Sequence, residues 1–288
     1  MPTGGPNRGA IQKGPNPGRV EKTRGGRYLH PAIQRLFILV RYFVISNESD
    51  RERRWEQRLT DEGFDVSEEY DTDAIIITLG GDGTILYAAR KYPEPTILPV
   101  RAGSSEGNRS SFDSEELLPA LERLEGGDGE LTRQTFSRIS AYRDGQELRG
   151  GFQALNEISL HHRSPILGAV FSVQIHDRGR TYEFERVIGD GILVATPFGS
   201  TGYYRSITGG TFSDGLGIAF NNIHKPQGTP IYKVCSTNAR IELELLTTTR
   251  SSGAVLTRDD DSEMYELAAK EPIVIRTTDD GVEIVDIE

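Results

Sequence analysis

Hydrophobic and polar segments alternate along the first part of the chain. Apolar runs of strand length are separated by segments with the mixed polar and apolar spacing of helices. Three runs predict strands, at residues 36–46, 73–79 and 96–100, and two segments predict helices, at residues 51–60 and 85–91. Strands that alternate with helices form a parallel sheet covered by helices, so the pattern predicts an α/β domain over residues 31–130.

The hydrophobic pattern changes after this domain. Residues 241–245 and 282–287 alternate between apolar and polar side chains, which is typical of half-buried strands. Turn sequences between such segments predict hairpins at Asp144-Gly145, Asp177-Arg178-Gly179 and Asp280-Gly281. We therefore expect an all-β domain over residues 131–268.

The first residues of the chain have a different composition. Residues 1–27 are rich in Gly, Pro, Arg and Lys and contain almost no large apolar side chains. Such a segment cannot bury enough apolar surface to offset the entropy lost on ordering. We expect residues 1–30 to form a disordered, solvated tail, and contact of its positive charge with an acidic surface or RNA is the alternative.

The chain as a whole is acidic and poor in lysine. Its formal net charge is -10, and only six of its 33 Lys and Arg residues are lysines. Domains that bind nucleic acid need basic surface to neutralise phosphates, so no nucleic-acid partner is expected. An acidic, lysine-poor composition is typical of salt-adapted proteins, such as haloarchaeal ones, and also of high-GC genomes.

Cysteine content and hydropathy suggest a soluble intracellular enzyme. The single cysteine, Cys235, excludes an internal disulfide framework and favours the cytoplasm, with its thiol buried as a small apolar group. The longest apolar run, residues 36–45, is interrupted by Arg41 and is too short to span a bilayer. The amino terminus does not have the pattern of a signal peptide, so no membrane partner is expected.

A glycine-rich turn joins the second predicted strand to the second predicted helix. Residues 78–84 read Thr-Leu-Gly-Gly-Asp-Gly-Thr. Gly80, Gly81 and Gly83 let the backbone turn sharply and bring N–H groups close to a ligand, at a helix start that favours anions. A carboxylate beside a bound phosphate is repelled by it, so Asp82 is expected to act as a general base on a hydroxyl or in metal binding. The structural alternative is an Asp-Gly turn in which Asp82 only caps the helix.

Two later segments complete a recognisable set of motifs. Asn156-Glu157 leads into a short apolar strand, and residues 189–206 read Gly-Asp-Gly-Ile-Leu-Val-Ala-Thr-Pro-Phe-Gly-Ser-Thr-Gly-Tyr-Tyr-Arg-Ser. In order and approximate spacing the three segments resemble the NAD kinase family. Its signatures are a GGDGT turn, an Asn-Glu or Asn-Asp pair, and a D-G-x-x-x-x-T-P-x-G-S-T-x-Y segment. The turn alone is weakly specific, since lipid kinases and phosphofructokinases share it, but the long segment is highly specific.

The resemblance implies a fold and a reaction. It implies an N-terminal Rossmann-like α/β domain that carries the GGDGT turn and a C-terminal β-sandwich-like domain, with residues 269–288 returning to the first domain. It implies transfer of the terminal phosphoryl group of ATP, or of inorganic polyphosphate, to the 2′-hydroxyl of the adenosine ribose of NAD, with Mg²⁺. The active site would lie between domains and between the subunits of a homodimer or homotetramer.

The resemblance also implies roles for single residues. Asp82 is the general base, Asn156 and Glu157 hold ribose hydroxyls or dinucleotide phosphates, and Asp190 accepts a hydrogen bond from the adenine amino group. The residues implied to surround the phosphates are Gly80, Gly81, Gly83 and Thr84, and those implied to line the adenine pocket are Thr201, Gly202, Tyr203 and Ser206. The structural alternatives are a hairpin corner at the Asn-Glu pair and an ordinary turn at Asp190.

The chain departs from the family pattern near the dinucleotide. Residues 101–112 lack the usual Gly-Phe-Leu ending, and Phe198 stands where a small hydroxyl residue is common. In that loop Arg101 and Arg109 either contact phosphates or pair with surface carboxylates. A kinase for a different nucleotide or small alcohol therefore stays open, as does a dinucleotide-binding sensor without turnover. A lipid kinase would share the turn but would not explain residues 189–206.

Other conspicuous residues have structural interpretations. His161 and His162 are neighbours on a predicted strand and point to opposite faces, so they cannot easily share a metal ion. Asp259-Asp260-Asp261 lacks the spaced ligands of a calcium loop and is expected to be a solvated acidic turn. Tyr204 is expected to pack in a hydrophobic core.

Overall fold

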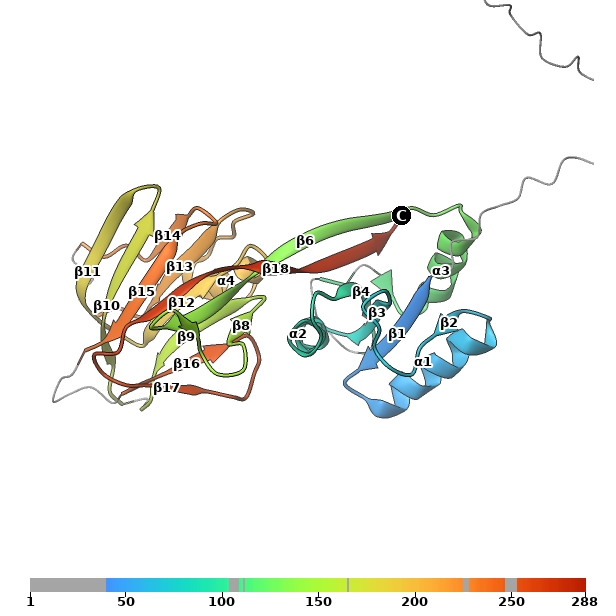
Figure 1. The fold of residues 1–288 in the computed structure, drawn as a ribbon, viewed down its shortest axis with the longest axis horizontal. Coiled ribbons are helices and arrows are strands. Elements are labelled where there is room, and N and C mark those ends of the chain that lie inside the picture. The colour runs from blue at the N-terminus through green and yellow to red at the C-terminus, as the bar shows by residue number, and fades with distance from the viewer. Residues whose placement is uncertain (1–39, 104–108, 111, 165, 225–227, 247–252) are drawn as a thin grey trace, which may run out of the picture. The chain divides into compact units, whose positions relative to one another are not determined.

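Two β-sheets account for most of the described chain (Figure 1). The computed structural model describes residues 40–288 except 104–108, 111, 165, 225–227 and 247–252. The predicted tail over residues 1–30 lies outside these residues, as does the beginning of the first predicted strand. Within the described chain the larger sheet has 12 strands and the smaller has 6.

The first sheet begins with an α/β layer. Its elements are β1 (Arg41–Ser46), α1 (Ser49–Asp61), β2 (Asp65–Val66), β3 (Ile75–Gly80), α2 (Asp82–Lys91), β4 (Thr96–Arg101), β5 (Phe112–Asp113) and α3 (Leu117–Gly126). β3 lies between β1 and β4 and pairs in parallel with both. Ile75, Ile77 and Leu79 pack in one core with α1 and α3, whereas Ile76 packs on the other face with α2. The predicted order of strands and helices is confirmed here, and the helix α3 and the short strands β2 and β5 were not predicted.

The rest of the chain is almost entirely β-structure. Its elements are β6 (Leu131–Arg143), β7 (Gln146–Glu147), β8 (Gln153–Ala154), β9 (Glu157–His162), β10 (Ala169–Asp177), β11 (Arg180–Gly189), β12 (Gly191–Ala195), η1 (Gly199–Thr201), α4 (Tyr203–Thr208), β13 (Leu216–Asn221), β14 (Tyr232–Cys235), β15 (Arg240–Leu245), β16 (Ala254–Arg258), β17 (Tyr265–Leu267) and β18 (Ile273–Ile287). The smaller sheet runs β14-β13-β12-β9-β16-β17 and is antiparallel. Its Ile158, Leu160 and Val194 share one core with Phe171 and Val173 of β10, in the other sheet. Two sheets packed over a common core form a β-sandwich, as expected.

Two of the three predicted hairpins are confirmed. Asp144-Gly145 joins β6 to β7, and Arg178-Gly179 joins β10 to β11, with positive φ at all four residues. The hairpin at Asp280-Gly281 is wrong, because both residues lie inside the single long strand β18. The pairing of β18 with β6 shifts register between Thr277 and Gly281, so the Asp-Gly pair belongs to a bulge.

The last strand returns to the α/β layer. β18 runs antiparallel to β6 along most of its length, and the two strands lie side by side in Figure 1. Beyond the bulge, Glu283 and Ile284 pair in parallel with Thr96 and Ile97 of β4. The larger sheet is therefore continuous from the α/β layer into the sandwich.

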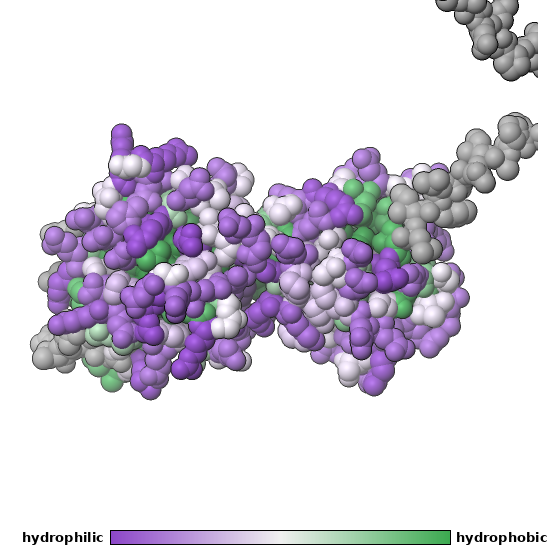
Figure 2. Space-filling view, in the orientation of Figure 1, coloured by the Kyte–Doolittle hydropathy of each residue, from purple (hydrophilic) through white to green (hydrophobic). Residues whose placement is uncertain are grey.

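The visible surface is mostly hydrophilic, with scattered apolar positions (Figure 2). Three exposed apolar side chains gather at one sheet edge, Ile231 beside β14 and Tyr232 and Val234 on it. In the part of the chain that is described, every helix is too short or too polar to cross a membrane.

Candidate active site

The glycine-rich turn connects β3 directly to α2. β3 ends at Gly80 and α2 begins at Asp82, three residues before the predicted helix start. A Cβ at Gly80 would lie 2.2 Å from the Thr84 hydroxyl oxygen, so a larger residue would force the Thr84 side chain to move. Because α2 begins at Asp82, this residue lies in the first helical turn, where the helix dipole favours a negative charge or a bound anion.

Asp82 does not cap its helix. The N-cap position is Gly81, and no side-chain capping bond is present there. The Asp82 side chain instead accepts a hydrogen bond at Oδ1 from the backbone N–H of Arg109, at 3.3 Å. The capping alternative from the sequence is wrong, and the carboxylate of this partly buried residue contacts the divergent loop.

The Asn156-Glu157 pair is held by a carboxylate that the sequence did not identify. Asp259 accepts the backbone N–H of Asn156 at 2.7 Å and of Glu157 at 3.1 Å through Oδ1, and that of Leu155 at 2.9 Å through Oδ2. The prediction of a solvated acidic turn is wrong for Asp259, because its acceptors fix the backbone of a motif 100 or more positions earlier in the chain. The neighbouring Asp260 is exposed and pairs with Arg90 of α2 at 3.0 Å.

Burial raises the pKa of both Glu157 and Asp259. The Glu157 side chain is buried, and its Oε2 has no partner within the described residues. Burial, and then the charges of Asp259 and Asp260, raise the pKa of Glu157 to about 8. Burial also raises the pKa of Asp259 to about 6, although three backbone N–H groups stabilise its anion. At neutral pH we assign the proton to Glu157 and the negative charge to Asp259.

The Asn-Glu pair also packs against the later motif. A Cβ at Gly199 would lie 2.2 Å from the Asn156 carbonyl oxygen, so only glycine fits there. The Thr196 N–H donates to the same carbonyl at 2.9 Å, and the Thr196 hydroxyl donates to Leu155 O at 2.5 Å. These contacts join the strand β9 to the turn that begins residues 196–202.

Asp190 and Tyr203 form a second polar group. The Asp190 carboxylate accepts from Asn222 Nδ2 at 3.0 Å and lies 3.6 Å from His162 Nε2. The Tyr203 ring stacks on His161, with 5.9 Å between ring centroids, and its hydroxyl accepts from an asparagine, Asn221 Nδ2, at 2.9 Å. The two adjacent histidines thus contact different partners, as their opposite faces on β9 require.

The remaining expected residues lie on η1 and α4. Thr201 accepts a hydrogen bond from Arg109 Nη2 at 3.5 Å, and Ser206 donates to the carbonyl of Gly202 at 3.4 Å. Gly202, Tyr203 and Ser206 are exposed. Tyr204 is fully buried against Phe212, as predicted.

Electrostatic effects link the two polar groups. Burial raises the pKa of Tyr203, and the charges of Asp190 and Glu157 raise it further. The structure therefore brings Asp190, Tyr203 and Glu157 within electrostatic reach of one another. Asp82 reaches the later motif through one residue, Arg109.

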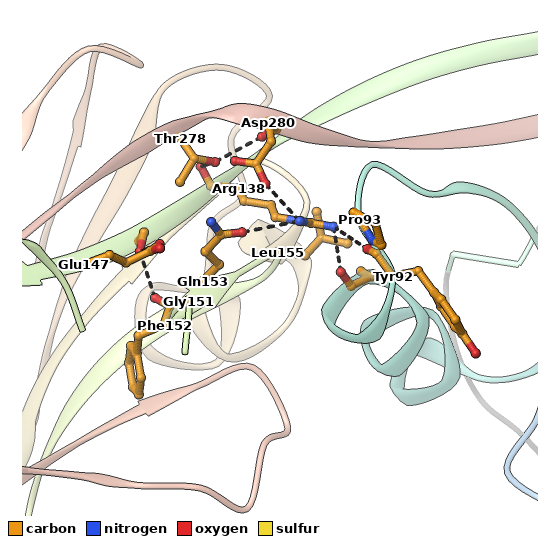
Figure 3. A network of polar contacts seen from close by, with 12 residues as sticks. Tyr92, Pro93, Arg138, Glu147, Gly151, Phe152, Gln153, Leu155, Thr278 and Asp280 are labelled. Atoms are coloured by element: carbon orange, nitrogen blue, oxygen red, sulfur yellow. Dashed lines mark hydrogen bonds and ion pairs between the residues drawn. The ribbon is translucent and has the colours of Figure 1, made fainter. Parts of the chain in front are cut away.

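An arginine on β6 fixes the other end of the helix that carries Asp82 (Figure 3). Arg138 is 7% exposed and donates through Nη2 to Ala89 O at 2.6 Å and Tyr92 O at 3.4 Å, at the end of α2. Through Nη1 it donates to Asp280 at 3.0 Å and Gln153 at 3.3 Å. The bulge in β18 therefore positions a carboxylate that binds this arginine, and the arginine orients α2.

One cavity borders the turn, and a second borders Arg109. One of about 440 Å³ is lined by Gly83, Thr84, Ser46 and Tyr87 among others. A second of about 640 Å³ is lined by residues that include Arg109, Ser110, Phe136 and Phe198. Both have the size of small-molecule sites.

The residues around the turn provide few ligands for a metal ion. Over the described positions, no group of three or more His, Cys, Asp or Glu side chains could hold a metal ion. Mg²⁺ at phosphoryl-transfer sites is typically bound by one or two carboxylates, water and substrate phosphates. Asp82 at a glycine-rich helix start fits a Mg²⁺ ion that would be held mainly by a nucleotide.

The sequence is similar to those of known nucleotide kinases. No protein-family model matches the sequence. The chain is 33% identical over 147 residues to the NAD kinase of Geotalea daltonii, covering 50% of this chain and 49% of that protein. It is 27% identical over 216 residues to NAD kinase 2 of Bacillus licheniformis, covering 71% and 77%. The chain thus spans about half the length of the first of these relatives, and both are nucleotide kinases by name.

The fold is similar to those of two solved kinase structures. The yeast NADH kinase complexed with NADH superposes with a TM-score of 0.71 at 16% identity, over 86% of this chain and 83% of that one. The Archaeoglobus fulgidus NAD kinase in complex with ATP superposes with a TM-score of 0.65 at 20% identity, over 85% and 93%. The chain has the fold of the NAD kinases, as the resemblance of its motifs implied.

Proposed function

We propose that this protein phosphorylates the 2′-hydroxyl of the adenosine ribose of NAD and so forms NADP. The observation that carries the proposal is the position of Asp82. A carboxylate in the first turn of a helix, on a glycine turn suited to phosphates, is joined through Arg109 to the motif that resembles the adenine-binding segment of NAD kinases. The curated relatives named NAD kinase and the ATP and NADH complexes of the structural neighbours support it.

Asp82 acts as the general base in this reaction. The ribose hydroxyl is a weak nucleophile at neutral pH, so its proton passes to the Asp82 carboxylate as the oxygen attacks the terminal phosphorus of the donor. The bond from that oxygen to phosphorus forms, the bond from phosphorus to the bridging oxygen of the donor breaks, and ADP or shortened polyphosphate leaves. Mg²⁺ bound to the donor would neutralise charge on the phosphates.

The other expected residues bind and orient the substrates. Gly80, Gly81, Gly83 and Thr84 surround the phosphates, which accept hydrogen bonds from backbone N–H groups of the turn. Asn156 and Glu157 hold ribose hydroxyls or dinucleotide phosphates, in a backbone geometry that Asp259 maintains. The residues proposed for the adenine pocket are Asp190, Thr201, Gly202, Tyr203 and Ser206.

A kinase with a different acceptor is the second candidate. Phe198 and the arginine that stacks on it occupy the region where the chain departs from the family pattern. The Phe198 side chain alters the wall of the site and not the turn with its base, so it affects the choice of acceptor more than the type of reaction.

The quaternary structure and location are part of the proposal. The exposed apolar edge formed by Ile231, Tyr232 and Val234 is suited to contact with a second copy, which supports a homodimer or homotetramer. The single cysteine supports a cytoplasmic location.

Product formation tests the proposal. Purified protein is incubated with Mg²⁺, ATP or polyphosphate, and a panel of NAD, NADH and other adenine nucleotides, and products are separated by chromatography. NADP from NAD supports the proposal. A different phosphorylated product would favour the second candidate, and tight NAD binding without any product would favour a sensor without turnover.

A further inference from the structure

Arg109 brings a positive charge to the site without a negative partner among the described residues. Its guanidinium donates through Nη2 to the carbonyl oxygens of Phe198 at 2.6 Å and Pro197 at 3.4 Å, and to the Thr201 hydroxyl at 3.5 Å. All three acceptors are neutral. Its Nε is buried, and no acceptor for it exists within the described part of the chain.

Two phenylalanines hold the guanidinium in place. The Arg109 Cζ lies 4.6 Å from the ring centroid of Phe198 and 5.9 Å from that of Phe136. The two rings contact each other edge to face at 5.0 Å. Cation–π contacts orient an arginine without using its hydrogen-bond donors. Phe198, a departure from the family pattern, thus supports a second departure, the arginine in the loop.

The charge of the proposed base, Asp82, acts on Arg109. Burial lowers the pKa of Arg109, and the Asp82 carboxylate opposes this change. Because an arginine remains charged in proteins, burial leaves a cation that lacks full compensation. The Arg109 backbone N–H also binds Asp82, so the cation and the base are fixed to the same loop residue.

We propose that Arg109 is a further catalytic residue, whose guanidinium binds the phosphoryl group that passes from the donor to the acceptor. This inference rests on the proposed function, in which a polyanionic donor must reach Asp82. The guanidinium neutralises charge on the oxygens of the transferred group while the bond to the acceptor forms, the bond to the leaving phosphate breaks and the proton moves to Asp82. Arg109 forms no covalent bond itself. Arg109 also lines a cavity of about 640 Å³, together with Phe136 and Phe198.

The competing explanation is that Arg109 only fastens the loop to residues 197–201. A fastener would affect folding and every ligand equally. A phosphoryl-binding arginine would affect the donor and turnover while leaving the affinity for NAD unchanged. The experiment must therefore separate the donor from the acceptor.

We would compare Arg109→Ala and Arg109→Lys with Arg101→Ala. Arg101 is the last residue of β4, before the loop that holds Arg109. Its side chain is 42% exposed and lies 3.6 Å from the carboxylate of Asp113, so its removal makes the same charge change at an arginine that has a negative partner. Calorimetry would measure the binding of magnesium tripolyphosphate and, separately, of NAD to the full chain. Steady-state kinetics with ATP would give kcat and both KM values.

The expected result is a loss of tripolyphosphate affinity of roughly 10- to 100-fold in Arg109→Ala, the size expected for charge-assisted hydrogen bonds. The lysine variant should recover part of this loss, NAD affinity should stay within about twofold because no NAD contact is assigned to Arg109, and Arg101→Ala should bind like the unmodified chain. Added methylguanidine should restore part of the turnover of Arg109→Ala.

Equal weakening of NAD and tripolyphosphate binding, or no change in either, would overturn the inference. If the unmodified chain bound tripolyphosphate through Arg109 but formed no NADP, the proposed function would be wrong, and the binding of phosphate groups by Arg109 would still be supported. If NADP formed at the same rate in Arg109→Ala, the inference alone would fail.

Discussion

Replacing Asp259 should destabilise the protein by leaving the backbone around the Asn156-Glu157 pair without its acceptor. Its carboxylate accepts three backbone N–H groups, from Leu155, Asn156 and Glu157, at 2.7–3.1 Å. In Asp259→Ala these donors lose their acceptor. Asp259→Asn retains an oxygen for two donors and presents an amide to the third.

The magnitude follows from two opposing effects. A buried donor left without an acceptor costs about 1–3 kcal/mol, so three of them cost about 6 kcal/mol. Burial raises the pKa of Asp259 to about 6, which means that the ionised carboxylate already costs the folded state about 3 kcal/mol at pH 7. The expected net loss in Asp259→Ala is about 3 kcal/mol at pH 7, and about 1–2 kcal/mol in Asp259→Asn.

The loss should also depend on pH. Folding raises the pKa of this acid, so the folded protein binds more protons than the unfolded chain between about pH 4 and pH 6, and the Asp259 contribution to stability falls as pH rises through that range. Asp259→Ala lacks this dependence. Its destabilisation relative to the unmodified protein should therefore be larger at pH 5 than at pH 7.5.

Urea unfolding at both pH values measures these quantities, with KM for NAD as a second readout. Asp260→Asn is the matched control, because that carboxylate is 45% exposed and pairs with Arg90 at the surface. It should cost less than about 1 kcal/mol. The reasoning fails if Asp259→Ala is no less stable than the control.

Two further predictions concern buried charges. Burial raises the pKa of Glu157 to about 8, so the folded protein keeps a proton that the unfolded chain loses near pH 4.5. The free energy of unfolding should therefore fall as the pH rises from 4.5 to 8. Glu157→Gln should be more stable than the unmodified protein at pH 8.5, by about 2–4 kcal/mol in urea unfolding. An equal pH dependence in the variant would contradict this. Arg138→Met should lose about 3–5 kcal/mol in thermal unfolding, because Asp280 and two carbonyl oxygens lose their partner. A melting temperature unchanged from that of the unmodified protein would show that Arg138 does not hold α2.

Local sequence was sufficient where local chemistry decides the structure. The tight turns at Asp144-Gly145 and Arg178-Gly179 have positive φ, and Gly80 leaves no room for a side chain beside Thr84. Short motifs report such local requirements. The period-two pattern of residues 241–245 likewise predicted the half-buried strand β15.

Distant partners decided the features that the sequence could not predict. Asp280-Gly281 has the residues of a hairpin, yet β6 pairs on both sides of it and keeps β18 continuous. Three consecutive aspartates look alike locally, and only the backbone at residues 155–157 selects Asp259 as the acceptor. No pattern near Arg109 indicated that its side chain would stack on Phe198.

Turnover of Asp82→Asn tests the central claim most directly. The substitution keeps the size of the side chain and the acceptor for the Arg109 N–H, and it removes the base. NADP formation is followed under saturating NAD and ATP, with NAD affinity measured on the same preparation. We expect a loss of turnover of about 100-fold or more with NAD affinity unchanged. Turnover equal to that of the unmodified protein would contradict the assignment of Asp82 as the group that deprotonates the ribose hydroxyl.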